Sequence, residues 1–201
     1  MMPCVAIRRI GADGRGTTLV EFGLVAPVML LMIMGFFDLA HQAYASSILQ
    51  GAMQEAARDS TLESGSATAK SAAIDAFVEE RVREVTGNAA TFSSKRLSYY
   101  DFGSVGDPEN FVDAAPLNGT YDLGECFEDV NGNGTWDSDL GKSGQGGAQD
   151  AVLYRMTVTY PRLFPMAGLL GWSNEQVISA TTVLRNQPYG AQSKPVYAIC
   201  T

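Results

Sequence analysis

The sequence has a single histidine, His41, and three cysteines, Cys4, Cys126 and Cys200, among its 201 residues. A hydrolase with a catalytic triad needs an imidazole base beside its nucleophile, and a structural zinc site needs four nitrogen or sulfur ligands. One histidine directly after an apolar run and three scattered cysteines meet neither requirement. We therefore expect a protein that is not an enzyme.

Basic residues are also scarce, with 14 Lys and Arg against 22 Asp and Glu and a net charge of −8. Within the first sixteen residues, Arg8, Arg9 and Arg15 outweigh Asp13 and give +2, which leaves −10 for the rest of the chain. An acidic domain without clustered Lys or Arg repels the phosphate backbone. We expect no nucleic-acid partner.

The longest apolar run, from Phe22 to Phe37, reads FGLVAPVMLLMIMGFF and contains no charged residue. With its flanks it extends over about 20 residues, interrupted only by Glu21 and Asp38, which is the length that crosses a bilayer as a helix. A cleaved secretory signal ending near Ala45 and a buried core helix are the two alternatives.

The charges around this run predict its direction in the membrane. Arg8, Arg9 and Arg15 precede it, whereas the first basic residue after it is Arg58. By the positive-inside rule, the N-terminus is cytoplasmic and the C-terminal bulk lies outside. We expect a single-pass protein of the inner, cytoplasmic membrane, with the lipid bilayer as its first partner.

The residues before the run resemble the processing site of type IV pilins and pseudopilins, in which a basic leader ends in Gly. Cleavage by a prepilin peptidase after Gly16 would make Thr17 the first residue of the mature chain and Glu21 its fifth. A carboxylate at the membrane edge of an apolar helix costs free energy unless it has a cationic partner. In pilin assemblies the α-amine of an incoming subunit supplies this partner. The alternative is a glutamate that extends into the headgroups.

The longer stretch RGTTLVEFGLVAPVMLLMIMGFFDLAHQAY resembles the TadE/TadG-like family, the minor pseudopilins of the tight-adherence (Tad, or Flp) pilus systems. The matching residues are Arg15, Gly16, Val20, Glu21, Phe22, Pro27, Gly35 and Asp38. A weaker resemblance covers Val158 to Tyr189. The family implies processing at Gly16 and Thr17, subunit docking through Glu21, and other pilins, pseudopilins and Tad platform proteins as partners.

The rest of the sequence predicts an α+β fold with a pilin-like head. Good helix formers continue the first helix to about Ser60, and apolar residues at helical spacing predict a second amphipathic helix over 67–85. Alternating residues predict antiparallel strands over 152–160 and 177–185, with a weaker strand over 92–102. The organisation is a cytoplasmic leader (1–16), a transmembrane and spine helix (17–60) and an extracytoplasmic head (61–201).

Two features of the predicted head have alternative interpretations. In an oxidising compartment Cys126 and Cys200, the only cysteines beyond the apolar run, would pair as a disulfide; the alternative is two free thiols. The segment from Leu163 to Trp172, LFPMAGLLGW, is apolar. We favour a packed loop there, and the alternative is a patch that meets the membrane or a partner.

A stretch of alternating oxygen-bearing side chains has the spacing of an EF-hand calcium loop. The candidate Ca²⁺ ligands are Asp129, Asn131, Asn133, Thr135, Asp137 and Asp139, with Thr135 offering its backbone carbonyl. The pattern departs at position 12, where Leu140 replaces the bidentate glutamate. The alternative is a glycine-rich loop whose Asx side chains bond their own backbone.

These patterns favour a non-enzymatic minor pilin or pseudopilin that acts in the assembly of a Tad-type pilus. The competing function is a binding or sensor domain outside the cytoplasm on a signal anchor, dependent on Ca²⁺. The sequence leaves open whether the subunit stays in the membrane or enters the extracellular pilus.

Overall fold

The computed structural model describes residues 15–62, 67–164, 168, 171–186 and 197–200. The described residues form two compact units. The helix unit comprises those within Met1–Ala43 and Arg162–Glu175, and the head unit comprises those within Tyr44–Pro161 and Gln176–Thr201. Predicted features of the leader, residues 1–14, lie outside the described residues.

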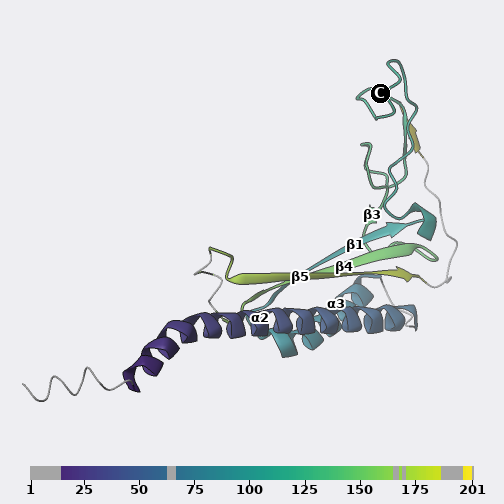
Figure 1. Cartoon of the computed structure of the whole chain (residues 1–201). Helices are drawn as coiled ribbons and strands as arrows, with labels where there is room; N and C mark the ends of the chain where they lie inside the picture. The colour runs from purple at the N-terminus through teal and green to yellow at the C-terminus, as the bar shows by residue number, and fades with distance from the viewer. Residues whose placement is uncertain (1–14, 63–66, 165–167, 169–170, 187–196, 201) are drawn as a thin grey trace, which may run out of the picture. The chain divides into compact units, whose positions relative to one another are not determined.

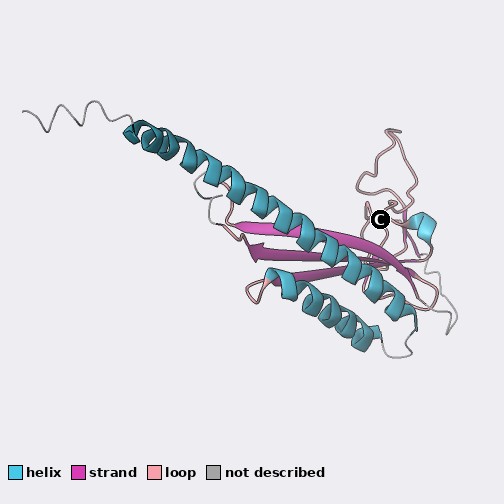
Figure 2. Cartoon of the chain, turned by 60° about the horizontal axis from the view of Figure 1, so that its bottom comes forward, coloured by secondary structure: helices cyan, strands magenta, loops and turns pink. Residues whose placement is uncertain are grey.

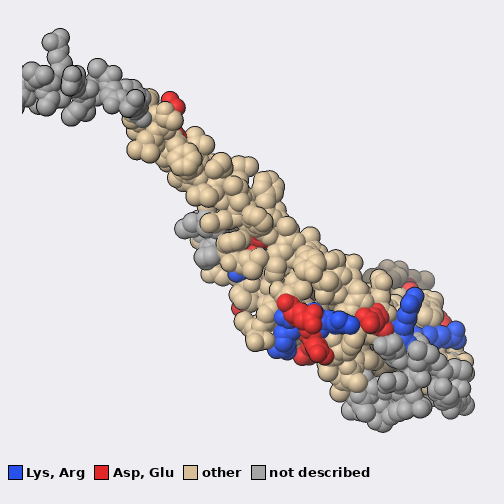
Figure 3. Space-filling model, turned by 90° about the horizontal axis from the view of Figure 1, so that it is seen from below, with Lys and Arg blue, Asp and Glu red and all other residues tan. Residues whose placement is uncertain are grey.

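Helix α2 runs from Arg15 to Leu62, close to the predicted bounds, and contains Pro27 (Figure 1). Its part between Gly16 and Arg58 is long and apolar enough to cross a membrane, and none of its most apolar stretch is buried against the described protein. Figure 3 shows an almost uncharged surface over the part of α2 that follows the grey N-terminal trace. The helix indicates single-pass membrane anchoring.

Helix α3 extends from Ala67 to Thr86, as the apolar spacing predicts. It ends at Gly87, which adopts a φ of 79° and donates its N–H to the carbonyl of Arg83 over 2.9 Å. Only glycine takes this left-handed conformation without steric cost, so Gly87 fixes the end of the helix.

A four-stranded sheet in the order β3-β1-β4-β5 completes the head. Strand β1 covers Thr91–Tyr99 and pairs antiparallel with both β3, Lys142–Ser143, and β4, Ala151–Pro161. Strand β5 covers Glu175–Arg185. Figures 1 and 2 show α3 and the part of α2 that belongs to the head unit on the same face of this sheet. This arrangement confirms the predicted α+β fold.

The core lies between these two helices and the sheet, within the head unit. Small and flexible residues of α2 meet alternate residues of the strands, because one face of a strand carries every second side chain. The fully buried large side chains of this core are Leu49, Met53, Val78, Val82, Val152, Tyr154, Met156, Val158 and Tyr160.

A partly buried polar network joins α3 to the sheet. The Asp75 carboxylate accepts hydrogen bonds from Arg96 Nη2 over 2.7 Å and from Arg96 Nη1 and Ser94 Oγ over 3.0 Å each. It also accepts one from the hydroxyl of Tyr154, over whose ring the guanidinium lies at 4.2 Å from the centroid. Burial alone would raise the pKa of Asp75, but these hydrogen bonds and the charge of Arg96 hold it below its ordinary value of 3.8.

The segment between β1 and β4 is mostly loop, and the predicted third strand is too long at its end. Phe102 does not extend β1 but begins the short 3-10 helix η1, Phe102–Ser104, where the Asp101 carboxylate accepts the N–H of Ser104. A capping aspartate competes with strand pairing for the backbone, which explains the early end of β1.

Further along, a second, two-stranded sheet pairs β2, Phe127–Asp129, with β6, Tyr197–Ile199. The disulfide between Cys126 and Cys200 flanks this pairing. Four aromatic rings pack beside it, with Tyr121 stacked on Trp136 at 4.9 Å between centroids. The other contacts are edge-on and involve Phe111, Tyr121, Phe127 and Trp136. These contacts give a glycine-rich segment a small core of its own.

Candidate functional site

The Glu21 carboxylate lies on an exposed part of α2, and the stretch that follows it, from Phe22 to Phe37, carries no charge. Its neighbours Val20 and Phe22 have 69% and 61% of their surface exposed. Among the described residues, no ion pair or hydrogen bond involves Glu21. An isolated carboxylate on an apolar helix is costly in lipid, and this cost favours a cationic partner from outside the chain.

The predicted processing residues lie one helical turn before Glu21. Both Gly16 and Thr17 are exposed and belong to the first turn of α2. Thr17 and Glu21 are four residues apart and therefore lie on the same face of the helix. No described side chain comes within 4 Å of a Cβ placed on Gly16, so the backbone at this position is sterically open.

The second candidate site, the loop with the calcium-like spacing, is organised by a residue far from it in the sequence. Glu109 is buried, with 1% of its surface exposed. Its carboxylate accepts the N–H groups of Val130 over 2.8 Å, Asn131 over 3.4 Å and Asp137 over 3.1 Å. Its backbone carbonyl accepts the indole N–H of Trp136 over 2.8 Å. Sequence reasoning missed Glu109, because no local pattern distinguishes it from a surface glutamate.

Three of the six predicted calcium ligands meet at one point of this loop. The side-chain amides of Asn131 and Asn133 both donate to the same oxygen of Asp137, over 2.7 and 2.5 Å. The Asp129 carboxylate instead accepts backbone N–H groups at Gly132, Asn133 and Gly134, in an Asx-turn arrangement. A cation would have to replace these hydrogen bonds with oxygen coordination.

The remaining two candidates differ in their contacts. Asn133 Oδ1 accepts both the N–H and the hydroxyl of Thr135. Asp139 is engaged elsewhere: its carboxylate accepts the hydroxyl of Tyr99 over 2.8 Å and the N–H of Gly141 over 3.0 Å. Burial and this hydrogen bond raise the pKa of Tyr99, so its hydroxyl remains the donor at physiological pH. Asp139 thus fastens the loop to β1.

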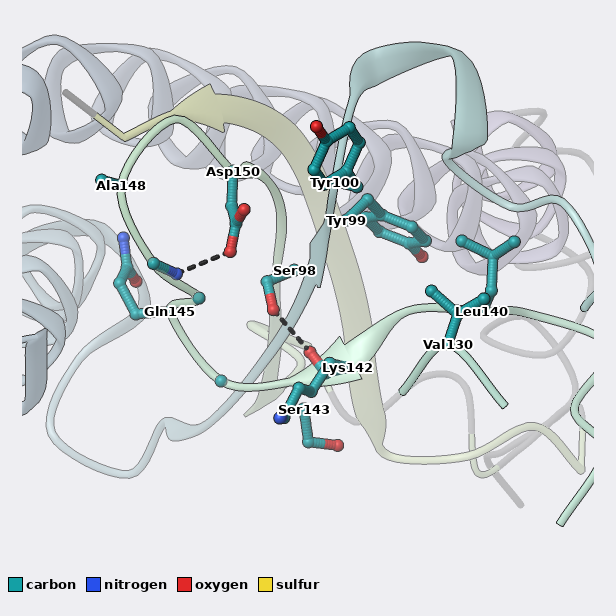
Figure 4. Close-up of a pocket in the computed structure, with 13 residues that line it drawn as sticks. Ser98, Tyr99, Tyr100, Val130, Leu140, Lys142, Ser143, Gln145, Ala148 and Asp150 are labelled. Carbon is teal, nitrogen blue, oxygen red and sulfur yellow. Dashed lines mark hydrogen bonds between the residues drawn. The ribbon is translucent and has the colours of Figure 1, made fainter. Parts of the chain in front are cut away.

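A polar cavity of about 360 Å³ lies between the end of β1 and the loop that precedes β4 (Figure 4). The groups that line it bond to one another and to Asn186: Ser98 donates to the carbonyl of Lys142, and the Gly147 N–H donates to Asp150. The side-chain amide of Asn186 donates to the carbonyls of Gln145 and Gly147. Gly146 approaches so closely that an added Cβ would lie 2.6 Å from Ser98 and from Asp150. These contacts hold the loop that precedes β4 in place. We therefore interpret the cavity as a consequence of how this loop packs against β1.

Calcium binding stays a prediction, and it has a direct test on the full chain in detergent. Calorimetric titration with CaCl₂ is expected to give saturable heat with a Kd of roughly 10⁻⁴ to 10⁻³ M, since two of the side-chain ligands are neutral amides. Asp137→Ala should abolish this heat, whereas Asp113→Ala, in a separate turn held by Asn118 and Gly119, should not. Absence of both heat and a shift in Tm would contradict the prediction.

Within the described residues, no group of three or more His, Cys, Asp or Glu side chains is placed to share a metal ion. Comparison with known proteins gives a match within helix α2. A family model described as TadE-like protein matches residues 16–58, which include Gly16, Thr17 and Glu21. Neither the curated proteins nor the solved structures gave a match. Residues 16–58 therefore resemble TadE-like proteins, and this match suggests involvement in the Tad pilus system.

Proposed function

We propose that this chain is a minor pilin or pseudopilin, a non-enzymatic subunit in the assembly of a Tad-type pilus. The observation that carries the proposal is the exposed Glu21 carboxylate on the apolar part of α2, which has no partner among the described residues and lies within the segment that matches the TadE-like model. In this role the chain would lie across the inner membrane with its N-terminus in the cytoplasm, and its head would face outward.

In the proposed mechanism, a prepilin peptidase cuts after Gly16 and releases the α-amine of Thr17. The amine of one subunit then pairs with the Glu21 carboxylate of a neighbour. Each charge is costly in lipid by itself, and pairing offsets part of that cost. Since only one axial offset brings the two groups together, the pair also sets the register between neighbouring helices. Other pilins, pseudopilins and the Tad platform proteins are the partners.

Sequencing the N-terminus of the membrane-extracted protein tests the processing step. A mature chain beginning at Thr17 is the expected result. A chain that retains the leader would favour the competing function, a signal-anchored binding or sensor domain outside the cytoplasm. A start after Ala45 would indicate a secreted protein and would contradict both functions.

Replacing Glu21 with glutamine tests the docking step. Glu21→Gln is expected to leave membrane insertion intact and to lower recovery of the subunit with its pilus partners at least tenfold, since an ion pair worth about 1.4 kcal/mol changes a binding constant tenfold. The measurement is co-purification from detergent extracts, together with a count of surface pili.

The control for this experiment is Glu55→Gln, because Glu55 is an exposed glutamate of the same helix in the head unit. It removes one charge without touching the apolar part of α2. Equal recovery of the Glu21→Gln and Glu55→Gln variants would contradict a docking role for Glu21.

A further inference from the structure

The loop between β4 and β5 belongs to the helix unit and not to the sheet that it connects. Arg162 holds it there through three contacts. Its N–H donates to the carbonyl of Asn174 over 2.9 Å, and its Nε donates to the carbonyl of Ser173 over 2.9 Å. Its Nη1 forms an ion pair with the Asp38 carboxylate of α2. One arginine thus closes the base of the loop and fastens it to the helix.

Asp38 marks the outer end of the apolar part of α2. It lies seventeen residues after Glu21, which corresponds to about 26 Å along a helix. The hydrocarbon core of a bilayer is about 30 Å thick, so Glu21 and Asp38 bracket it closely. The side chains of Asp38 and Arg162 are 16% and 17% exposed, and their opposite charges compensate one another at this boundary.

The residues that follow Arg162 suit a lipid interface. No charged residue occurs between Arg162 and Glu175. Leu163 and Trp172 are 53% and 65% exposed, so the packed loop that the sequence favoured is wrong for these two residues. Tryptophan is enriched at the boundary between lipid and water, where arginine can also anchor a chain.

We propose that Leu163 and Trp172, near the two ends of this loop, form a second membrane contact and enter the outer interfacial layer of the bilayer that α2 spans. The occupant of the exposed apolar surface is lipid, because the ion pair with Asp38 fixes the base of the loop at the end of the membrane span. Two attachment points restrict the rotation of the chain about the axis of α2. The inference rests on the membrane span of α2 and not on the proposed role in a pilus.

Tryptophan fluorescence of the full chain in lipid vesicles tests this contact. The sequence holds two tryptophans, so Trp136→Phe leaves Trp172 as the only reporter, and Trp172→Phe leaves Trp136 as a matched control in the head unit. With phosphatidylcholine and phosphatidylglycerol brominated near the headgroup end of the acyl chains, Trp172 is expected to be strongly quenched, because an indole in the interfacial layer lies beside these bromine atoms. Trp136 should lose far less.

The outcomes separate the loop from the helix. Chains that resist carbonate extraction while Trp172 is quenched no more than Trp136 would overturn the loop contact and leave the span of α2 standing. Chains released by carbonate would overturn both. Protection of Trp172 from aqueous acrylamide without quenching by brominated lipid would also overturn the proposal, since a protein surface, such as a second copy of this chain, would then cover the loop.

Charge reversal tests the attachment to α2. Arg162→Asp, in the Trp136→Phe background, is expected to reduce quenching of Trp172 to the level of Trp136, because it places two carboxylates side by side. Adding Asp38→Arg restores an opposite pair and should recover most of the quenching. Unchanged quenching in the single variant, or no recovery in the double variant, would contradict the role of the ion pair.

Discussion

Replacing Asp75 with asparagine is expected to lower the free energy of unfolding of the head unit by about 3 kcal/mol. Removing one partner of a buried, hydrogen-bonded ion pair costs about 3 to 5 kcal/mol, because the other charge is left without compensation. The Arg96 side chain is 9% exposed and that of Asp75 is 23% exposed, which favours the lower end of this range. Asparagine also offers only one acceptor oxygen, whereas the carboxylate accepts these hydrogen bonds with two oxygens.

The same network predicts a loss of stability in acid. The pKa of Asp75 in the folded protein lies below its ordinary value of 3.8, so the unfolded chain binds the proton more tightly. Its contribution to stability is therefore fully present well above pH 3.8 and is lost as the pH falls below 3.8 through the folded pKa. The difference in stability between the wild type and Asp75→Asn should shrink over that window.

Hydrogen exchange of the full chain in detergent, read on peptides from β1 and β4, measures both effects. Glu84→Gln is the matched control, because Glu84 is an exposed carboxylate of the same helix and is expected to change stability by less than about 0.5 kcal/mol. Arg96→Lys should lie between the wild type and Asp75→Asn, since lysine keeps the charge and loses the bidentate geometry. A pH-independent difference between wild type and Asp75→Asn would contradict the assignment of the effect to ionisation of Asp75.

The elements that the sequence predicted are those whose signals are local and periodic. The helical spacing of apolar residues in α3 and their alternation in β4 and β5 indicate that one face of each element is buried. This can be inferred from the sequence without knowing which element packs against that face. The long apolar run of α2 is an equally local signal, because its length alone predicts a helix that can span a membrane. The bounds of α2, α3 and β4 accordingly agree with the prediction to within two residues.

The contacts that sequence reasoning missed join residues far apart in the chain. The pairing of β2 with β6 involves strands of three residues, too short to show a period. The ion pair between Asp38 and Arg162 spans 124 residues. Both side chains look like ordinary membrane-flanking or surface charges until the fold brings them together. Leu163 and Trp172 are exposed although a packed loop is the favoured prediction there, because apolar composition alone does not distinguish a buried segment from an exposed apolar patch.

Glu109 gives the second large expected effect. Glu109→Ala removes the acceptor for three backbone N–H groups of the loop between Val130 and Asp137. A buried donor left without a partner costs about 1 to 3 kcal/mol, and the cavity left by the side chain adds to this cost. We expect a loss of about 3 kcal/mol or more. Glu109→Gln should cost about half as much, since the amide keeps one acceptor oxygen and turns an N–H toward the other donors.

The indole of Trp136 reports directly on this region, because it donates to the Glu109 carbonyl and stacks on Tyr121. Urea unfolding of the full chain in detergent, followed by Trp136 emission in the Trp172→Phe background, measures the loss. Glu128→Ala is the control, because the Glu128 carboxylate accepts one exposed hydrogen bond, from Asn110. If Glu109→Ala and Glu128→Ala shift the midpoint equally, Glu109 does not organise the loop. If Glu109→Ala alone shifts it, one buried carboxylate holds together a glycine-rich segment that has little secondary structure of its own.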